Sequence, residues 1–476
     1  MKTLVTTVVL FLSTLILSGQ NQITTATDLA AINEDEESLK GNYQLMNDIT
    51  VENWAPIGTL KSPFFGTFDG NGHTITILSF AADPTWEGDA FSTISIGLFG
   101  SVGKNALIMN LRVAGELTYD SGPKTLYMGA IAGNNEGTIR CCVSTADINA
   151  RGGRYTTGRG IGQVFLPALT GSSNAITVYQ NEACGGGIVG LNKNRIENCY
   201  ATGKITVSGE GHKSAGGIAG RNGFNKEGNI LQCYATGDVS AQEDAASRLA
   251  GGVTGLNFSG NIINCAALNG KIEAIGKRKG MSIGGFGIAY PSNTAFGVVA
   301  LNYQAISKMK NIYYRSDMTI HTEVDEENMR NNKIDEKKTL LHGNRGKDTD
   351  YALMQEQSWW SNDKSGVVFP FGTDGNNPWV WSKSRKRPIL YWEMSKDERI
   401  SDNTNTAKVE RKPIVNAKDS VIIQKTNKDL EIVPKTNKDP EIVPKTNKDS
   451  KIIPKTNPAS TETLEERILR LREQLK

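Results

Sequence analysis

The chain has 476 residues, of which 50 are glycine, and aromatic residues make up only 7%. Its 53 basic and 50 acidic residues leave a formal charge of +3, which is too balanced to make nucleic acid or an acidic membrane the main partner. High glycine content without a glycine at every third position excludes a collagen-like rod and indicates a turn-rich, all-β chain.

Residues 1–19 have the pattern of a signal peptide. Lys2 supplies a positive charge, an apolar stretch runs from Leu4 to Leu17, and Ser18 and Gly19 offer a small-residue cleavage point. No later run reaches the roughly 18 apolar residues of a transmembrane helix, so no transmembrane segment is expected. We predict an exported protein, extracellular or on the outer cell surface, with the periplasm as the alternative.

The first element after the signal peptide is predicted to be a short amphipathic helix over Thr25–Asn33, with Thr or Asp as its N-cap. Such a helix would cover the first turn of a solenoid, whose strand edges are otherwise unpaired. Further along, Asp69–Gly72 separates two β-rich runs and predicts a strand-turn-strand unit.

A short pattern, Gly-Gly-aliphatic-x-Gly-x-Asn, recurs in the middle of the chain at spacings of 30 and 35 residues. Its fixed residues are Gly186, Gly187, Gly190 and Asn192, then Gly216, Gly217, Gly220 and Asn222, then Gly251, Gly252, Gly255 and Asn257. A looser copy covers Gly129–Asn135. Repeats of this length are stacked units that cannot bury their apolar faces alone, so residues 20–317 are predicted to form a β-solenoid.

Four cysteines hold the same place after successive copies, 9 to 13 residues beyond the third glycine: Cys142, Cys199, Cys233 and Cys265. We expect them to stack on successive turns as small, reduced and buried side chains. An even number of cysteines in an exported chain also indicates disulfides, but a bridge between stacked neighbours about 4.8 Å apart is usually strained.

Two inserts interrupt the period, at about residues 150–178 and 277–300. Loops that project from one face of a repeat array are frequent binding elements, and tolerated surface insertions are the other interpretation. Arg151, Arg154 and Tyr155 in the first insert, like the basic stretch Lys383–Arg387, are candidate contacts for an anionic glycan, or else side chains of ordinary solvated loops.

After a polar connection at residues 318–358, the segment 359–395 contains five of the seven tryptophans. It is predicted to close the C-terminal end of the solenoid as a compact aromatic cap. In the alternative interpretation one or two of its rings are exposed and stack on sugars. The candidates are Trp359, Trp360, Trp379 and Trp381.

Residues 396–459 repeat Lys-Thr-Asn-Lys-Asp with a period of ten residues and with prolines in register, which predicts a disordered or extended spacer. Residues 460–476 are predicted to form an amphipathic helix with a coiled-coil seam of Leu464, Ile468, Leu471 and Leu475. This helix is expected to form a homo-oligomer or to dock on a partner helix, or else to be a solvated helix that frays.

The repeat copies, the strand Asn198–Gly203 and the run Phe68–His73 resemble the GLUG-motif repeat proteins of bacterial surfaces and secretions, some of which are attached to immunoglobulin A proteases. The resemblance covers roughly Thr25–Asp317. It implies a right-handed parallel β-helix-like solenoid on the outside of a bacterium, often linked with adhesion. The family is defined by its repeat and has no general activity, so the resemblance implies no catalytic residue.

The sequence contains no familiar catalytic motif. Its four histidines have no metal-ligand spacing, so neither a metal nor a cofactor is expected. Asp69 with His73 and the run Asp374–Asn377 are the sharpest polar groupings, and both are interpreted as turns. These observations favour a protein that is not an enzyme.

The predicted function is that of a secreted or surface-exposed, adhesin-like binding protein, which recognises a glycan or protein ligand through the solenoid face and the inserts. Two alternatives stay open. One is a β-helix polysaccharide lyase or glycoside hydrolase, which carboxylates converging near the inserts would favour. The other is a structural spacer whose C-terminal helix mediates oligomerisation.

Overall fold

The computed structural model describes residues 20–81, 92–153, 155–158, 177–224, 227–243, 247–276, 293–302, 308–322, 346–362 and 364–394. The predicted signal peptide, the spacer and the C-terminal helix with Leu464, Ile468, Leu471 and Leu475 lie outside these residues. None of the helices in the described part of the chain has the length and apolar character that a membrane span requires.

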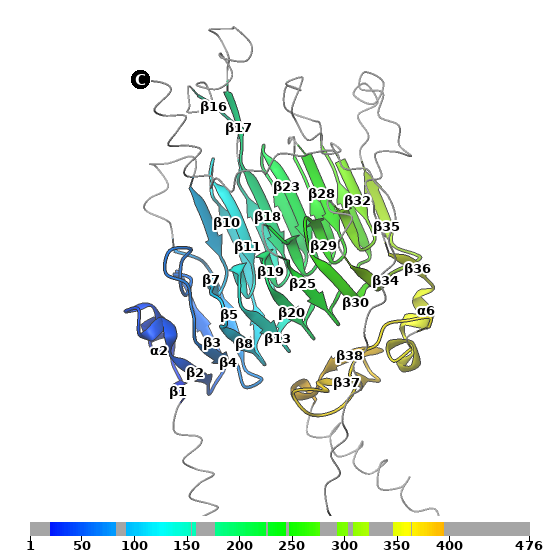
Figure 1. The fold of residues 1–476 in the computed structure, drawn as a ribbon, viewed down its shortest axis with the longest axis horizontal. Helices are drawn as coiled ribbons and strands as arrows, with labels where there is room; N and C mark the ends of the chain where they lie inside the picture. The colour runs from blue at the N-terminus through cyan, green and yellow to red at the C-terminus, as the bar shows by residue number, and fades with distance from the viewer. Residues whose placement is uncertain are drawn as a thin grey trace, which may run out of the picture. The chain divides into compact units, whose positions relative to one another are not determined.

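Strands from successive repeats pair in parallel and in register, and this stacking forms a β-solenoid (Figure 1). The predicted all-β solenoid is therefore confirmed. Each middle turn runs through four sheets in order. We name three of them by their first strands, the β6 sheet, the β7 sheet and the β10 sheet, and the fourth, which lies between the β7 and β10 sheets along the chain, the large sheet.

Three of these sheets contain six strands each within the described residues. The β6 sheet consists of β6 (Thr93–Ile96), β11 (Thr125–Gly129), β18 (Glu182–Gly186), β23 (His212–Gly216), β28 (Ser247–Gly251) and β32 (Asn293–Phe296). The β7 sheet consists of β7 (Phe99–Val102), β12 (Ala132–Asn135), β19 (Val189–Asn192), β24 (Ala219–Asn222), β29 (Thr254–Asn257) and β33 (Val299–Asn302). The β10 sheet consists of β10 (Glu116–Asp120), β15 (Asp147–Arg151), β22 (Ile205–Ser208), β27 (Val239–Ala241), β31 (Lys271–Ala274) and β35 (Thr319–Thr322).

The large sheet has two halves that meet at β30 (Asn261–Ala267). One half consists of β1 (Asn21–Ile23), β2 (Asn42–Leu45), β4 (Thr67–Asp69), β8 (Leu107–Met109), β13 (Thr138–Arg140), β20 (Arg195–Glu197) and β25 (Asn229–Leu231). The other half consists of β3 (Ile49–Val51), β5 (Thr74–Ile77), β9 (Arg112–Ala114), β14 (Val143–Ser144), β21 (Tyr200–Ala201) and β26 (Tyr234–Ala235). Beyond β30, the sheet continues with β34 (Met309–Arg315) and β36 (Lys347–Thr349).

The predicted N-terminal helix is present as α2 (Ala26–Ala30), which continues into the 3-10 turn η1 (Ala31–Asn33) and is followed by η2 (Ser38–Lys40). Thr25 is the N-cap: its hydroxyl accepts the backbone N–H of Asp28, and the Asp28 carboxylate accepts the backbone N–H of Thr25. Leu29 and Ile32 are completely buried. The helix therefore packs its apolar face against the first strands of the solenoid.

The glycines of the repeat motif allow the β7 sheet to lie directly against the β6 sheet. A Cβ on Gly220 would lie 2.7 Å from the backbone nitrogen of Gly185, in the β6-sheet strand of the preceding turn. A Cβ on Gly187 would clash with the carbonyl oxygen of Gly217 in the next turn. Backbone packs on backbone at these places, and no side chain fits between.

The motif asparagines form a buried ladder across the turns. Asn135 donates to Asn192 at 2.9 Å, and Asn192 donates to Asn222 at 2.8 Å. Asn222 in turn donates to Asn257 at 2.9 Å. All four amides are completely buried, so each one satisfies a hydrogen-bonding group of the next.

The cysteines form a second ladder. Cys142, Cys199, Cys233 and Cys265 are completely buried free thiols, and Cys141 and Cys184 are buried free thiols as well. Burial raises the pKa of Cys199 and Cys265 well above the ordinary value. This is the packed and unbridged arrangement that the spacing predicts.

The solenoid extends past the boundary predicted at residue 317. A further turn contains β32, β33, β34 and β35, and β36 pairs with β34 beyond it. In this turn Phe296 lies in register with Gly251. The second insert therefore ends before Asn293, and not near residue 300, and part of the predicted polar connection belongs to the sheets.

The aromatic segment forms the expected compact core, but it packs along the side of the solenoid and not over its last turn. Together with the end of the predicted polar connection, which supplies α6 (Tyr351–Met354) and the start of η4 (Gln357–Trp360), it contains an antiparallel hairpin of β37 (Trp379–Ser382) and β38 (Arg387–Leu390), and η5 (Tyr391–Glu393). Its buried residues share a cluster with residues from successive turns of the large sheet and its flanks: Cys141, Val143, Tyr200, Tyr234, Ala266, Leu268 and Tyr313.

Candidate functional site

Both inserts leave and re-enter the solenoid at one edge, where strands of the β10 sheet end and strands of the β6 sheet begin. The first insert leaves after Arg151 and returns at Glu182, and the second leaves after Ala274 and returns at Asn293. Figure 1 shows the labelled strands of these sheets ending along this edge, with the hairpin of β16 (Tyr155–Gly158) and β17 (Thr177–Gln180) extending from it. We call this edge the insert corner.

Two cations occupy core positions at the insert corner. Lys213 and Arg248 are completely buried in neighbouring strands of the β6 sheet, in register with Ala183. The Lys213 ammonium donates to the carbonyl oxygen of Gly152 at 2.7 Å, and Arg248 donates to the carbonyl oxygen of Glu243 at 2.9 Å. Burial lowers the pKa of Lys213 to about 7. The two side chains therefore hold the stems of the corner connections from inside the solenoid.

A second polar cluster lies beside Lys213, between the β6 and β7 sheets. Arg221 lies 2.8 Å from both carboxylate oxygens of Glu182, and the Tyr127 hydroxyl donates to the same carboxylate at 2.6 Å. The Arg221 guanidinium also lies over the rings of Phe224 and Phe258, at 4.5 and 4.9 Å from their centroids. Glu182 is thus held by two donors, and Arg221 by one carboxylate and two ring faces.

A cavity of about 60 Å³ opens between these clusters. It is lined by Glu182, His212, Lys213, Ser214, Arg221, Ser247, Leu249 and Leu256. Since one water needs about 10 to 15 Å³ of such space, the cavity has room for a few waters or for one small polar group. The charged pair at this cavity is Arg221 with Glu182, because the Lys213 side chain points to the opposite face of its strand, into the core with Ala183.

The candidate ligand contacts of the first insert are only partly described. Arg151 lies at the insert corner with a side chain that is 45% exposed, and it forms ion pairs with Asp120 at 3.4 Å and with Glu243. Tyr155 belongs to β16, but its side chain lies outside the described part of the chain, as does all of Arg154. Arg151 is the member of this set that the structure places at the corner.

Three of the four candidate tryptophans have no free face for a sugar. Trp359, Trp360 and Trp379 are 5%, 0% and 0% exposed. Trp359 packs edge-on against Trp360 with ring centroids 5.1 Å apart, and Trp379 packs against Phe369 at 4.7 Å. Trp381 is half-buried beside the same cluster. The first three rings belong to the core of the aromatic segment, which corrects their assignment as candidate ligand contacts.

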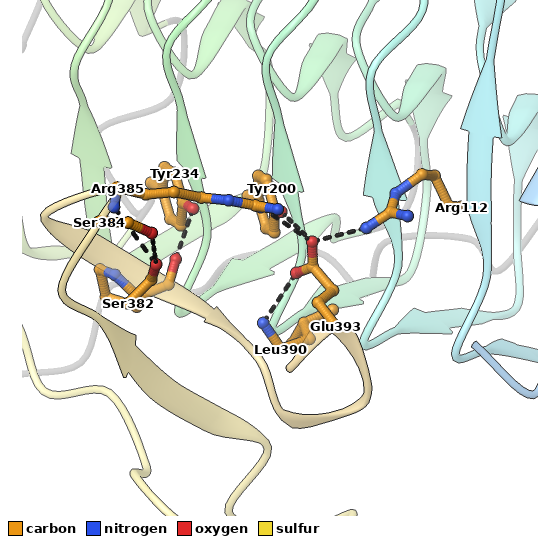
Figure 2. A network of polar contacts seen from close by, with 9 residues as sticks. Arg112, Tyr200, Tyr234, Ser382, Ser384, Arg385, Leu390 and Glu393 are labelled. Carbon is orange, nitrogen blue, oxygen red and sulfur yellow. Dashed lines mark hydrogen bonds and ion pairs between the residues drawn. The ribbon is translucent and has the colours of Figure 1, made fainter. Parts of the chain in front are cut away.

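A buried carboxylate fastens the aromatic segment to the solenoid, as Figure 2 shows. The Glu393 side chain is completely buried, and its Oε1 accepts hydrogen bonds from Arg112 at 2.7 Å, from the Tyr200 hydroxyl at 2.6 Å and from Arg385 at 3.2 Å. Its Oε2 accepts the backbone N–H of Leu390 at 2.9 Å. Arg385 of the basic stretch is therefore occupied, and we assign this network a structural role.

The pair Asp69 and His73 does not form a site. Asp69 accepts the backbone N–H of Asn71 at 2.9 Å and the side chain of Asn110 at 3.0 Å, whereas the His73 ring lies 3.3 Å from Asp48. Asp69 therefore serves its turn, as the Asp-Gly-Asn-Gly sequence predicts.

The Asp374 turn has the same structural character. The Asp374 carboxylate accepts the backbone N–H groups of Asn377 and Asn376, and these bonds lower its pKa. Across the described part of the chain, no group of three or more His, Cys, Asp and Glu side chains is arranged to hold a metal ion.

Sequence reasoning missed Lys213, Arg221 and Arg248. Lys213 and Arg248 each stand three residues before the first glycine of a motif copy, where the preceding copy has Ala183. A charge at a core position of a repeat is a signal that alignment of the copies could have revealed.

Parallel stacked strands, a glycine motif that brings two sheets together, and inserts gathered at one corner define a β-solenoid repeat protein. The GLUG motif matches residues 181–206 and 211–240, which are two consecutive turns of the solenoid. The solenoid therefore contains GLUG-motif repeats over these residues.

Relatives and solved structures match parts of the chain. "Halomucin" of Haloquadratum walsbyi is 29% identical over 168 residues, which are 33% of this chain and 2% of that protein. A "Putative Gly-rich membrane protein" of Evansella cellulosilytica is 36% identical over 106 residues, which are 21% of this chain and 11% of that protein. The crystal structure of a "putative immunoglobulin A1 protease" from Bacteroides ovatus shows 17% identity and a TM-score of 0.44, over 79% of this chain and 93% of that one. This chain thus spans only a small share of the two relatives.

Proposed function

We propose that this chain is a surface-exposed bacterial binding protein that recognises a glycan or protein ligand through the insert corner. The observation that carries the proposal is the convergence of both inserts on one edge of a rigid solenoid. Loops on a rigid scaffold are frequent binding elements, because the scaffold fixes their stems. The same edge holds the exposed Arg151, the buried cations and the cavity.

Export to the outer cell surface is part of the proposal. It is supported by the apolar stretch that follows Lys2 and by the name of one relative, a Gly-rich membrane protein. Fractionation of cells that express the tagged chain tests this part. Tag in the outer-membrane or medium fraction, accessible to added protease, supports it, and tag confined to the cytoplasm contradicts it.

A glycan and protein array tests the binding function. The purified chain is compared with a variant in which residues 159–176 are replaced by an Asn-Gly turn that joins Gly158 to Thr177, because the flanking strands already form an antiparallel hairpin. We expect the variant to lose at least tenfold in affinity for the ligands that the full chain selects. A Lys364→Ala variant, changed in the aromatic segment, serves as the control and should bind like the unaltered chain. Equal binding by all three proteins would exclude the insert corner.

A polysaccharide lyase or glycoside hydrolase is the second candidate, and one observation favours it. Lys213 has a pKa of about 7, which suits a general base, and Arg221 lines the same cavity. Against it, Lys213 has no exposed surface, and the cavity is far smaller than the roughly 300 Å³ of a usual small-molecule site. A reducing-end assay on the selected glycans decides, since product release supports the enzyme and binding without product supports the binding protein.

A further inference from the structure

Lys213 is a buried cation that has only neutral hydrogen-bond partners. Its side chain lies in the core, in register with Ala183 and Arg248, and the residue has no exposed surface. The ammonium donates to the carbonyl oxygen of Gly152 at 2.7 Å and to that of His212 at 3.4 Å, and no carboxylate of the described residues forms an ion pair with it. Burial without a counter-charge penalises the charged form, so the closed structure favours the neutral amine.

The carbonyl group that Lys213 holds belongs to the stem of the first insert. We call residues 151–153 and 181–182 the stem, because the chain leaves the solenoid at the first of these ranges and returns at the second. The N–H groups of Gly152 and Gly153 donate to backbone carbonyl oxygens outside the stem, at 3.2 and 3.0 Å. Such N–H groups exchange with solvent only when their hydrogen bonds break, so they report on local opening of the stem.

Opening of the stem and the charge of Lys213 are therefore coupled. Gly152 contacts the ammonium directly, so its displacement removes a partner from the ammonium and admits water in its place. The closed stem favours the neutral amine, and the open stem favours the hydrated ammonium. A falling pH supplies the proton that the open stem binds more tightly, and it shifts the equilibrium toward opening.

Other ionisable groups surround Lys213 without neutralising it. Arg248, in the same core row of the neighbouring strand, carries a like charge. The titratable and charged groups on the elements around this edge are Asp120 of β10, Lys124 before β11, Arg151 of β15, Glu182 and Cys184 of β18, Glu210 before β23, His212 of β23, and Glu243 and Arg248 at β28. Burial is the strongest influence among them, and it lowers the pKa of Lys213 to about 7.

We propose that Lys213 makes the stem of the first insert sensitive to pH, so that a larger fraction of molecules opens the stem locally as the pH falls from 9 to 6. The inference goes beyond the proposed function, because it concerns the hydrogen bonds of the stem and requires no ligand. With a pKa of about 7 in the closed stem and the ordinary 10.5 in the open one, the opening equilibrium should rise on the order of 100-fold over this range. Most of the rise lies above pH 7, where the closed stem binds fewer protons than the open stem.

Hydrogen exchange of the full chain tests the proposal. It is read by mass spectrometry on peptides that cover the stem, is corrected for the intrinsic exchange rate at each pH, and is run under conditions where the opening equilibrium sets the rate. The N–H groups of Gly152 and Gly153 should lose on the order of 100-fold in protection between pH 9 and pH 6. The Tyr200 N–H, which donates to the Cys142 carbonyl oxygen at 3.2 Å in the large sheet, is the internal reference and should change by about threefold or less. Equal protection of the stem at both pH values would overturn the proposal.

Two variants assign the effect to Lys213. Lys213→Met carries no charge, so its stem should stay protected at both pH values. Lys213→Arg is charged throughout, so its stem should exchange readily at both. The control is Lys271→Met, which removes an exposed lysine of the β10 sheet and should keep the full pH dependence. His212 is present in all three, so a pH dependence that persists in Lys213→Met would assign the effect to another group and would overturn the proposal.

The pH profile of the unaltered chain decides the question even where a variant fails to fold. Titration of Lys213 requires the loss of protection to occur mainly between pH 9 and pH 7 and to level off below pH 7. A loss confined to the range below pH 7 indicates protonation of a histidine or a carboxylate instead, and it would equally overturn the proposal.

Discussion

The insert corner and the aromatic segment both bury charge against the solenoid, but they satisfy it differently. Around Glu393, one carboxylate accepts from two arginines, a tyrosine and a backbone N–H. Around Lys213, the buried ammonium donates to the carbonyl oxygens of Gly152 and His212, and burial lowers its pKa to about 7. Buried charge alone therefore does not mark a binding site. Whether the buried charge is paired with an opposite charge, as at Glu393, or only with carbonyl oxygens, as at Lys213, decides its cost to stability.

The largest effect is expected from Trp379→Ala in the aromatic segment. Trp379 is completely buried, and its indole N–H donates to Asn198 at 2.8 Å. Truncation leaves a large cavity and an unpaired acceptor, so we expect a loss of about 4 kcal/mol in the free energy of unfolding, measured by urea denaturation. Trp381→Ala on the same hairpin is the control and should cost less, because that ring is only half-buried. Equal losses would contradict the assignment of Trp379 to the core.

Glu393→Gln should have the next largest effect. The change keeps the shape of the side chain but removes the buried negative charge that pairs with Arg112 and Arg385, whose own side chains are 26% and 43% exposed. We expect a loss of about 3 kcal/mol, together with faster proteolysis of residues 346–394. Glu197→Gln, which alters a more exposed ion pair with Arg195, should change stability by about 0.5 kcal/mol or less. A similarly small effect at Glu393 would mean that the network does not hold the segment.

Removing charge from the insert corner should have the opposite sign. Lys213 has a pKa of about 7 in the folded chain against an ordinary value of 10.5, so between these values the folded state binds fewer protons than the unfolded state. The stability contribution of Lys213 is therefore highest above pH 10.5 and is lost as the pH falls toward 7. Lys213→Met has no such loss, and we expect it to be about 1 to 3 kcal/mol more stable than the unaltered chain near pH 6.

The advantage of Lys213→Met should shrink as the pH rises from 7 to 9, which denaturation curves at several pH values will measure. The titratable groups that act on Lys213 are Cys184, Glu182, Glu243 and Glu210, and the neighbouring His212 contributes its carbonyl oxygen. They are present in both proteins, so the difference between the two curves isolates Lys213. A difference in the free energy of unfolding that stays constant across this range, or a variant that is less stable at pH 6, would contradict the unfavourable burial of the Lys213 charge.

The repeat could be predicted from the sequence because its glycines and asparagines are fixed by contacts between turns. A Cβ at Gly251 would lie 2.8 Å from the backbone nitrogen of Ala300 in the next turn, so the motif persists wherever a further turn follows. Phe296 replaces this glycine in the last turn, after which no further turn follows among the described residues. Terminal repeats commonly depart from the motif, and for this reason the motif did not reveal the last turn of the solenoid.

The candidate site and the position of the aromatic segment could not be predicted in the same way. Tyr200 and Tyr234 occur in the repeats Asn-Cys-Tyr and Gln-Cys-Tyr, but only the fold shows that their rings stack at 4.8 Å and face Trp379. The cavity depends on Lys213 and Arg221, which come from two sheets and from different places in the motif. Neither the packing of the tyrosines on Trp379 nor the cavity has a local sequence signature, because both depend on which residues of successive turns lie side by side.

The smallest effect on stability is expected from Arg151→Ala, which therefore gives the sharpest separation of binding from folding. Arg112 and Arg151 both pair with glutamates, but the partner of Arg112 is completely buried, while Arg151 and its partners Asp120 and Glu243 are each about 40% exposed or more. Removing Arg151 should change the free energy of unfolding by about 0.5 kcal/mol or less, because solvent screens its ion pairs. If the insert corner binds an anionic ligand, the same variant should lose several-fold in affinity on the array at low salt and little at high salt, since an exposed charge acts through a screened field. Unchanged affinity at low salt would leave Arg151 as an ordinary solvated side chain.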